Sequence, residues 1–337
     1  MSQIMGNRNH FHTYEIEIKD KKSFKNGDEF TYIVNILKEN LIKNLYSNTA
    51  GFVPYQFERG YSLDPTGDIE ENKVRDILVV KHYEKKEKPR KKIPDNLKAD
   101  YETIVSSSDF SDDLKKWLKN ILGDTYFITF LQDFIFIPGE SIKVIFPAGD
   151  RDNTLTYQLN PYFEDYFEFN LDSKVRKITS DLLEWMVWKV KRYDGGFLSS
   201  NLQIEDIEMY DSSAHLNNGE LKIELEGIED NIYAMVSMIS DERCKSISIT
   251  LRYHGDKFKF VLFPEGSYIP VWNSMVASYD ENNSANRVLI LEKISKEIIP
   301  QIYEHYLDKK SEWDTLKPKI EVEILSKVKE EFVEYGE

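Results

Sequence analysis

Short segments that alternate between apolar and polar residues recur along this chain, and polar turns separate them. Residues 13–19 (TYEIEIK) alternate strictly, and the turn 138–141 (PGES) divides two apolar runs at 126–137 and 142–146. Alternation with a period of two predicts half-buried strands, and a tight polar turn between two such runs predicts a hairpin. The longest uninterrupted apolar run is the five residues 232–236, whereas a membrane-spanning helix needs about 20. The pattern therefore favours antiparallel strands and no membrane span.

Other segments show helical spacing of their apolar residues. Helices are predicted after Asp28, from about Ser111 to Gly123 and from Asp181 to about Lys191. In the last of these, Asp181 and Glu184 are spaced for a capping box. Two further helices are predicted at the end of the chain, at 285–310 with an interruption at Pro300, and at 320–334.

The C-terminal third favours a β-meander, since strand-like segments lie near 202–209, 221–226, 232–239, 246–253 and 257–263 with polar turns between them. The predicted fold class is α+β, with antiparallel β-hairpins and a C-terminal β-meander packed with amphipathic helices. Three regions are expected: an N-terminal α+β region at 1–108 with a basic loop at 84–108, a helix-hairpin-helix α+β region at 109–196, and the antiparallel meander followed by two helices at 197–337.

Charge and cysteine content narrow the class of protein further. The formal charge is −15, from 44 basic and 59 acidic residues, and Cys244 is the single cysteine. One cysteine cannot form an intramolecular disulfide, which favours a reducing, cytoplasmic location. The residues 1–12 lack the apolar stretch of a signal peptide. Lys, Asn, Ile, Tyr and Phe are abundant and have A/T-rich codons, so a low-GC genome, as in a bacterial or phage source, is the favoured origin of much of the aromatic surplus, and clustering of aromatic residues at an interface is the alternative.

Motifs of several enzyme classes are absent from the sequence. Neither the P-loop nor the G-x-G-x-x-G fingerprint occurs, which disfavours ordinary nucleotide hydrolysis and dinucleotide binding. The G-x-S-x-G elbow, the H-E-x-x-H zinc helix, the kinase H-R-D loop and the EF-hand loop are missing as well. No cofactor is predicted.

One set of residues fits the letters of a metal-dependent nuclease, in which an Asp and an E-x-K hold a divalent cation. These are Asp211, Glu220 and Lys222. Such nucleases normally have an apolar strand leading into the E-x-K, but here the turn 217–219 (NNG) leads in and the apolar strand follows. A surface hairpin is therefore the favoured interpretation.

A basic run stands out against the acidic composition. Its positive residues are Lys81, Lys85, Lys86, Lys88, Arg90, Lys91 and Lys92. With Glu84 and Glu87 the run carries +5, which leaves −20 for the rest of the chain. A solvated loop is the favoured interpretation, followed by contact with an acidic protein surface or a second copy, and then by binding to nucleic-acid phosphates.

An acidic aromatic segment, 161–170 (PYFEDYFEFN), could form a partner-binding ridge, because aromatic rings carry binding hot spots. Its candidate residues are Tyr162, Phe163, Tyr166 and Phe167. The alternative, which is the favoured interpretation, is that these rings are buried in the core. Trp185 and Trp188, three residues apart on one helix face, are also expected to be core residues.

These features lead to three hypotheses. The first is a cytoplasmic binding or accessory protein of a larger bacterial or phage assembly, with a protein partner or self-association. The second is a divalent-metal-dependent hydrolase or nuclease, and the third is sequence-independent nucleic-acid binding through residues 81–92. Whether the chain is an enzyme stays open at this stage.

Overall fold

The fold was analysed in a computed structural model of the 337-residue chain. The described residues are 10–19, 29–43, 50–55, 67–69, 73–89, 102–109, 111–115, 125–147, 158–165, 167–170, 177–192, 196–213, 220–224, 244–275 and 283–334. Within these ranges, none of the helices combines the length and the apolar character needed to cross a membrane.

The described strands form one twelve-stranded sheet in which every pair of neighbouring strands is antiparallel. Along the sheet the order is β2-β4-β5-β6-β1-β12-β11-β10-β8-β9, with β3 beside β4 and β7 beside β1. The strands are β1 (Phe11–Ile18), β2 (Ala50–Pro54), β3 (Lys73–Val74), β4 (Ile77–Pro89), β5 (Thr125–Ile137), β6 (Ile142–Pro147), β7 (Phe167–Asn170), β8 (Leu202–Ser213), β9 (Glu220–Glu224), β10 (Cys244–Tyr253), β11 (Asp256–Leu262) and β12 (Tyr268–Pro270).

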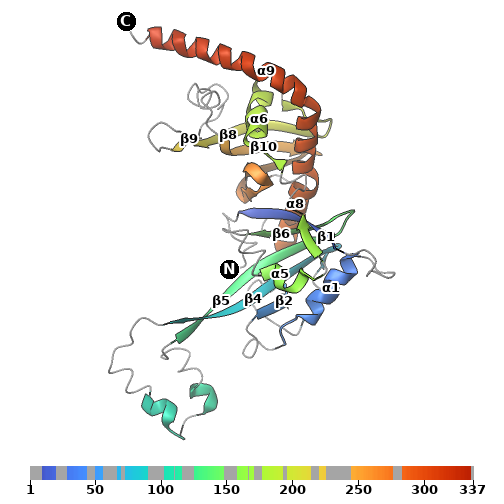
Figure 1. The fold of residues 1–337 in the computed structure, drawn as a ribbon, viewed down its shortest axis with the longest axis vertical. Coiled ribbons are helices and arrows are strands. Elements are labelled where there is room, and N and C mark those ends of the chain that lie inside the picture. Colours follow the sequence, from blue (N-terminus) through green and yellow to red (C-terminus); the bar gives the residue numbers. More distant parts are fainter. Residues whose placement is uncertain are drawn as a thin grey trace.

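Helices cover parts of this sheet (Figure 1). They are α1 (Glu29–Glu39), α5 (Asn160–Phe163), α6 (Ser180–Arg192), α8 (Ser284–Lys293) and α9 (Ile299–Glu334), with a π-helical turn, η9 (Ile294–Ile298), between the last two. Short 3-10 turns are η7 (Pro264–Gly266) and η8 (Trp272–Ser274). The predicted α+β class with antiparallel strands is therefore confirmed in its broad form.

The strands from β2 to β1 in this order, with β3 and β7, are called the N-terminal half of the sheet, and those from β12 to β9 the C-terminal half. The N-terminal half follows the sequence pattern closely. In β1, Tyr14 and Ile16 are buried. Glu15 and Glu17, which alternate with them along the strand, are more exposed, as strict alternation predicts. The turn at 138–141 joins β5 to β6 as an antiparallel hairpin. Helices α1 and α5 add their apolar side chains to the core on the same face as Tyr14.

The predicted basic loop begins differently in the structure. Residues 84–89 are not a loop but the end of β4, and they pair with residues 125–130 of β5. Residues 90–101, the next part of the predicted loop, lie outside the described residues. The predicted helix from Ser111 is described only at 112–115, where it is helical.

The C-terminal half is antiparallel as predicted, but its strands are not in simple meander order. Among the described strands, β8 lies between β9 and β10. In a simple meander β9 would pair with β10, the next described strand in sequence, but here both pair with β8. β10, β11 and β12 then pair in sequence order. The predicted strand at 232–239 lies outside the described residues.

One core joins the two halves of the sheet. Phe11 of β1 pairs with Tyr268 of β12, and both are fully buried in a cluster that also includes side chains of β5, α6 and α8. Strands from the predicted regions 1–108 and 109–196 also alternate in space, since β4 pairs with β5 and β1 with β6. The division into three regions stays a prediction.

The end of the chain is one continuous helical rod rather than two helices (Figure 1). The π-helical turn η9 immediately precedes Ile299 and Pro300, the position of the predicted interruption. A proline inside a continuous helix removes one N–H donor and crowds the carbonyl four residues earlier, and the wider π-helical turn before Pro300 is a local adjustment that lets the helix continue past it. The rod therefore continues through α9, which contains Pro318 as well.

Candidate functional site

Helix α6 lies between the C-terminal half of the sheet and helix α9 (Figure 1). Leu182, Leu183 and Met186 are fully buried in the shared core. Trp185 and Trp188 are also buried, as predicted, but they lie at the boundary with α9. Thr179 immediately precedes the helix, and its side-chain oxygen accepts from the backbone N–H of Leu182 at 3.2 Å.

Helix α9 contacts α6 through residues that recur at helical spacing. Tyr306, Trp313 and Ile320 are buried at intervals of seven residues, and Ile324 continues this stripe. Such a repeat keeps one face of a helix directed at a partner helix. Polar residues of α9 lie beside the same stripe and reach α6.

Asp181 is the hub of these polar contacts. Its Oδ1 accepts from Lys317 Nζ at 2.8 Å and from Trp313 Nε1 at 3.1 Å. Its Oδ2 accepts from Lys310 Nζ at 3.0 Å and from the hydroxyl of Tyr306. Asp181 therefore does not serve the predicted capping box: its carboxylate fastens α9 to the start of α6.

The charges in this network stabilise one another. Burial alone would raise the pKa of Asp181, but its four hydrogen bonds lower it well below its ordinary value. Burial and the bond to Asp181 raise the pKa of Tyr306 to about 12. Glu184 accepts from Lys317 Nζ at 2.8 Å, and the two carboxylates raise the pKa of Lys317 despite its burial. At neutral pH the carboxylate of Asp181 and the ammonium of Lys317 are therefore both charged.

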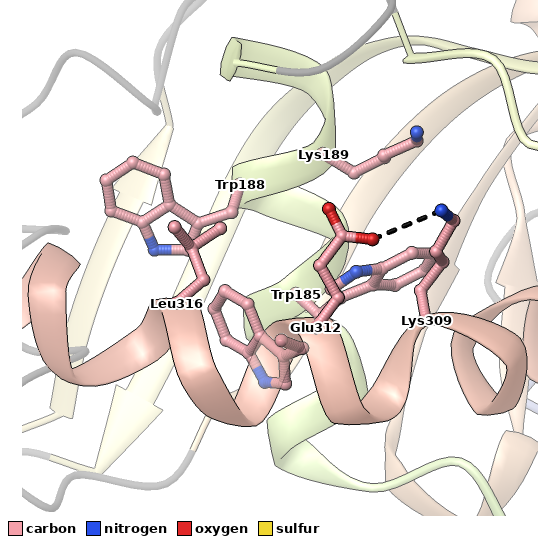
Figure 2. A pocket seen from close by; sticks show the side chains of 7 residues that line it. Trp185, Trp188, Lys189, Lys309, Glu312 and Leu316 are labelled. Atoms are coloured by element: carbon pink, nitrogen blue, oxygen red, sulfur yellow. Dashed lines mark hydrogen bonds and ion pairs between the residues drawn. The ribbon is translucent and has the colours of Figure 1, made fainter.

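Beside this network the surface is hollowed by a pocket of about 70 Å³ (Figure 2). That volume holds a few water molecules or the end of one apolar side chain. The α6–α9 pocket, as it is called below, is lined by Trp185, Trp188 and Lys189 from α6 and by Lys309, Glu312, Trp313 and Leu316 from α9.

Three of the five tryptophans of the chain thus line one hollow. Lys309 and Glu312 form an ion pair of 3.1 Å at its rim, and both side chains are about half exposed. A smaller hollow further along the helices shares Trp188 and Trp313 with it. The surface between α6 and α9 is therefore indented along more than one helical turn.

Two lysines and one glutamate, Lys189, Lys309 and Glu312, are the charged residues that line the pocket. Burial, followed by the charge of Lys189, lowers the pKa of His305, and Lys309 acts in the same direction. The His305 ring lies 5.9 Å from Trp185, and its buried Nε2 has no hydrogen-bond partner among the described residues. An apolar floor with cations close by suits an apolar side chain flanked by a carboxylate.

The predicted nuclease residues lie elsewhere, on β8 and β9. The backbone register places Asp211 opposite Lys222 and Glu220 opposite Ser213. Their side chains are outside the described part of the structure. Among the residues that are described, no group of three or more His, Cys, Asp and Glu side chains is arranged to hold a metal ion.

The predicted basic residues separate into two sets. Lys81 is buried, forms a 2.7 Å ion pair with the buried Asp133 and lies over the ring of Tyr55 at 4.4 Å. It therefore does not belong to a surface patch. Lys85, Lys86 and Lys88 lie at the end of β4, whereas Arg90, Lys91 and Lys92 are outside the described residues.

The predicted aromatic ridge is largely part of the core. Phe163 and Phe167 are 0% and 1% exposed, because α5 and β7 pack against the N-terminal half of the sheet. Tyr162 is partly buried and contacts Phe52. Tyr166 lies outside the described residues.

The structure brings the predicted aromatic segment next to the basic strand. The hydroxyl of Tyr162 lies 3.3 Å from Nε2 of His82 on β4, and Glu84 on the same strand pairs with Lys86 at 3.1 Å. Burial, then the charge of Lys86, lowers the pKa of His82 to about 4. Nδ1 of His82 is buried, and no residue in the described part of the chain forms a hydrogen bond with it.

Sequence reasoning missed the α6–α9 pocket and the role of Asp181. The contacts of Asp181 join residues more than 120 positions apart, which no local pattern predicts. One sequence signal was present. The seven-residue spacing of Tyr306, Trp313 and Ile320 indicates a helix face that packs against another helix.

No protein-family model matches this chain, and no curated protein sequence shows significant similarity to it. The geometry of the α6–α9 pocket is accordingly the main guide to function.

Proposed function

We propose that this chain is a binding protein, an accessory component of a larger assembly, and that it docks a segment of a partner protein in the α6–α9 pocket. The observation that carries the proposal is the convergence of Trp185, Trp188 and Trp313 on one surface hollow. Tryptophan is among the residues most enriched where a few contacts supply most of the binding energy of an interface.

The charged residues at the rim of the pocket indicate which kind of partner segment fits it. Lys189 and Lys309 lie at the pocket, and Lys309 already pairs with a carboxylate, Glu312 (Figure 2). A partner carboxylate near these lysines gains charge complementarity, which favours fast and selective association. The proposed occupant is therefore an apolar anchor side chain next to an Asp or Glu residue.

Rigidity of the walls supports the same function. Asp181 and Glu184 fasten α9 to α6 through Lys317, and Asp181 also binds Lys310 and Trp313. A pocket whose walls are held in place before binding loses less conformational entropy when the partner segment enters. The polar network thus keeps the hollow open.

Selection from a display library of random short peptides tests this function. Peptides with an apolar residue beside Asp or Glu are expected to bind the wild-type chain. Lys309→Glu is expected to weaken them about tenfold, with reduced salt dependence. Leu316→Phe, which enlarges a lining side chain, is expected to abolish binding.

The matched control is Lys319→Glu, since Lys319 is an exposed lysine of the same helix outside the pocket. It should bind the selected peptides as the wild type does. If no peptide is selected, or if Leu316→Phe binds the same peptides unchanged, the pocket is not the binding site. A dimer that Lys309→Glu dissociates would instead identify a second copy as the occupant.

A divalent-metal-dependent nuclease is the second candidate, favoured by the register that sets Asp211 opposite Lys222 on neighbouring strands. Incubation of the chain with plasmid and single-stranded DNA in Mg²⁺ or Mn²⁺ tests it. Cleavage that Glu220→Ala abolishes would support this site, and absence of cleavage would exclude it for these substrates.

A further inference from the structure

A second hollow lies at the end of the C-terminal half of the sheet, where β8 begins and β10 turns back into β11. Its volume is about 290 Å³, close to the lower limit of about 300 Å³ for small-molecule sites. It is called the turn pocket below, and its lining residues differ from those of the α6–α9 pocket. They include Phe197, Ser200, Asn201, Gln203, Arg252 and His254.

Backbone contacts hold the walls of the turn pocket in place. The backbone N–H of Leu198 donates to the carbonyl of Leu202 at 2.9 Å, which closes the loop before β8. The backbone N–H of His254 donates to the carbonyl of Asn201, also at 2.9 Å, and ties this loop to the β10–β11 turn. His254 and Gly255 have φ values of 50° and 88°, as the central residues of a type I′ hairpin turn do. Walls that are ordered before binding lose less conformational entropy when a ligand enters.

Phe197 brings an aromatic ring to the turn pocket. Its side chain is 50% exposed, the most among the Phe, Tyr and Trp residues whose side chains are described. Its backbone is nevertheless fixed, because it forms a β-bridge with Gln203. The face of an aromatic ring is electronegative, so it attracts the weakly positive C–H groups of a ligand that packs flat against it.

Neutral polar groups accompany this ring. Ser200 carries a hydroxyl, and Asn201 and Gln203 carry amides, so each of the three side chains can both donate and accept hydrogen bonds. Ser200 and Asn201 are exposed, and Gln203 is partly buried. A ligand with several hydroxyl groups, which also donate and accept, matches this set of side chains.

Arg252 adds a positive charge that a carboxylate already balances. Its Nε and Nη2 each lie 2.8 Å from Oε1 of Glu205, and its Nη1 donates to the carbonyl of Gly255 at 3.4 Å. The β8–β10 register places Arg252 opposite Gln203, which brings this ion pair beside the amides. A phosphate or carboxylate would have to compete with Glu205 for the guanidinium. The turn pocket therefore suits an uncharged ligand.

We propose that the turn pocket binds a carbohydrate, through one or two sugar rings of a glycan. The C–H face of a sugar ring packs on Phe197, and its hydroxyls form hydrogen bonds with Asn201, Gln203 and Arg252. Sugars combine the three properties that the turn pocket selects: a flat C–H face, several hydroxyls and no net charge. Such binding is independent of partner docking at the α6–α9 pocket.

A glycan array of common hexoses, N-acetylhexosamines and deoxyhexoses tests the proposal, followed by saturation-transfer difference NMR with the sugar that binds. Added salt should leave its affinity unchanged, because the ligand is neutral. Phe197→Ala should weaken binding about fivefold or more, whereas Phe197→Trp keeps an aromatic face and should retain it. Asn201→Ala, at an exposed side chain, should weaken binding as well.

Leu307→Ala is the matched control, because Leu307 is also 50% exposed but lies on α9 and lines neither hollow. It should bind the sugar as the wild type does, and circular dichroism should show that every variant is folded. Three results would overturn the proposal: no glycan bound by the wild type, sugar binding that neither Phe197→Ala nor Asn201→Ala weakens, or binding of adenosine or thymidine in place of sugars. The last result would identify a nucleobase as the group that packs on Phe197.

Discussion

Asp181 is the residue that determines how the two helices of the pocket are held. Four donors share its carboxylate, and two of them, Lys310 and Lys317, are charged. Hydrogen bonds to charged groups contribute about 1.5–3 kcal/mol each, more than neutral ones. Removing the carboxylate also leaves two lysines close together without their common counter-charge.

Asp181→Asn is therefore expected to lower the unfolding free energy at neutral pH by about 2 kcal/mol. The folded-state pKa of Asp181 is depressed, so its contribution is complete above an ordinary pKa of about 4 and is lost as the pH falls further. Urea unfolding of both proteins at pH 7 and below pH 4 should show a difference that narrows in acid.

Asp314→Asn is the control for this prediction. Asp314 pairs with the same lysine, Lys310, at 2.5 Å, but its side chain is 57% exposed. Exposed pairs contribute about 0–1 kcal/mol, so this variant should be close to the wild type. Equal losses in the two variants would show that Asp181 is no more than another surface carboxylate.

His82 is the second residue whose surroundings set its chemistry. It is 1% exposed, and burial together with Lys86 lowers its pKa to about 4. In the unfolded chain its pKa is about 6.5, so the unfolded state binds more protons between these values. The neutral ring stabilises the fold fully above pH 6.5, and this contribution is lost as the pH falls towards 4.

His82→Leu is expected to remove that pH dependence, which amounts to about 3 kcal/mol across the window. The measurement is the unfolding free energy of wild type and variant at pH 7 and pH 4.5, with the difference between the two proteins isolating His82 from the carboxylates. His254→Asn, at an exposed turn position with a φ of 50°, is the control and should behave like the wild type. A parallel decline of wild type and His82→Leu would contradict the account.

At the scale of elements, the entry into β8 depends on a close backbone approach. Gly196 has a φ of +78°, and a Cβ at this position would lie 2.0 Å from the carbonyl oxygen of Ile204. Gly255 in the turn between β10 and β11 has a similar φ of +88° but open space around it. An alanine at Gly255 would therefore meet backbone strain alone, whereas an alanine at Gly196 would meet backbone strain and a steric clash.

Gly255→Ala is expected to cost about 1 kcal/mol, from the left-handed backbone alone. Gly196→Ala should cost about 3 kcal/mol or more, because the backbone of Ile204 must also move. Thermal unfolding of both variants checks the order. Equal melting temperatures would mean that the approach of Gly196 to β8 does not constrain the fold.

Elements that depend on a local sequence pattern could be predicted, and those that depend on distant residues could not. Local patterns predicted β1, the β5–β6 hairpin and α6, because alternation at Tyr14 and Ile16 or helical spacing at Trp185 and Trp188 is contained in a few residues. They did not predict that β4 continues to Pro89, since that strand is completed by pairing with β5. The pairing of β8 with β10 and the contacts of Asp181 with α9 likewise depend on residues distant in sequence.

At the scale of the whole molecule, the two halves of the sheet share a core. Phe11 and Tyr268 meet at the junction of β1 and β12. Next to them, Ser295 of η9 binds the hydroxyls of Thr13 at 2.9 Å and Tyr268 at 2.7 Å, and all three side chains are buried. Neither half can separate without exposing apolar surface and breaking these hydrogen bonds.

The chain is therefore expected to unfold in one calorimetric transition, with equal calorimetric and van't Hoff enthalpies. Phe11→Ala should lower the stability of that single transition by about 3–5 kcal/mol, whereas Val322→Ala, at a side chain that is 66% exposed, should not. Two separate transitions in the wild type would show that the halves are independent domains.

Photo-crosslinking in the native host tests most directly whether the α6–α9 pocket receives a partner segment. A photoreactive amino acid replaces Glu312 at the rim of the pocket and, as the control, Lys319 on the same helix outside it. If the pocket receives such a segment, a crosslink is expected from position 312 alone, mapped to a peptide with an apolar residue beside Asp or Glu, and it is lost when Leu316→Phe is added. Crosslinks of equal yield from both positions, or from neither, would contradict it.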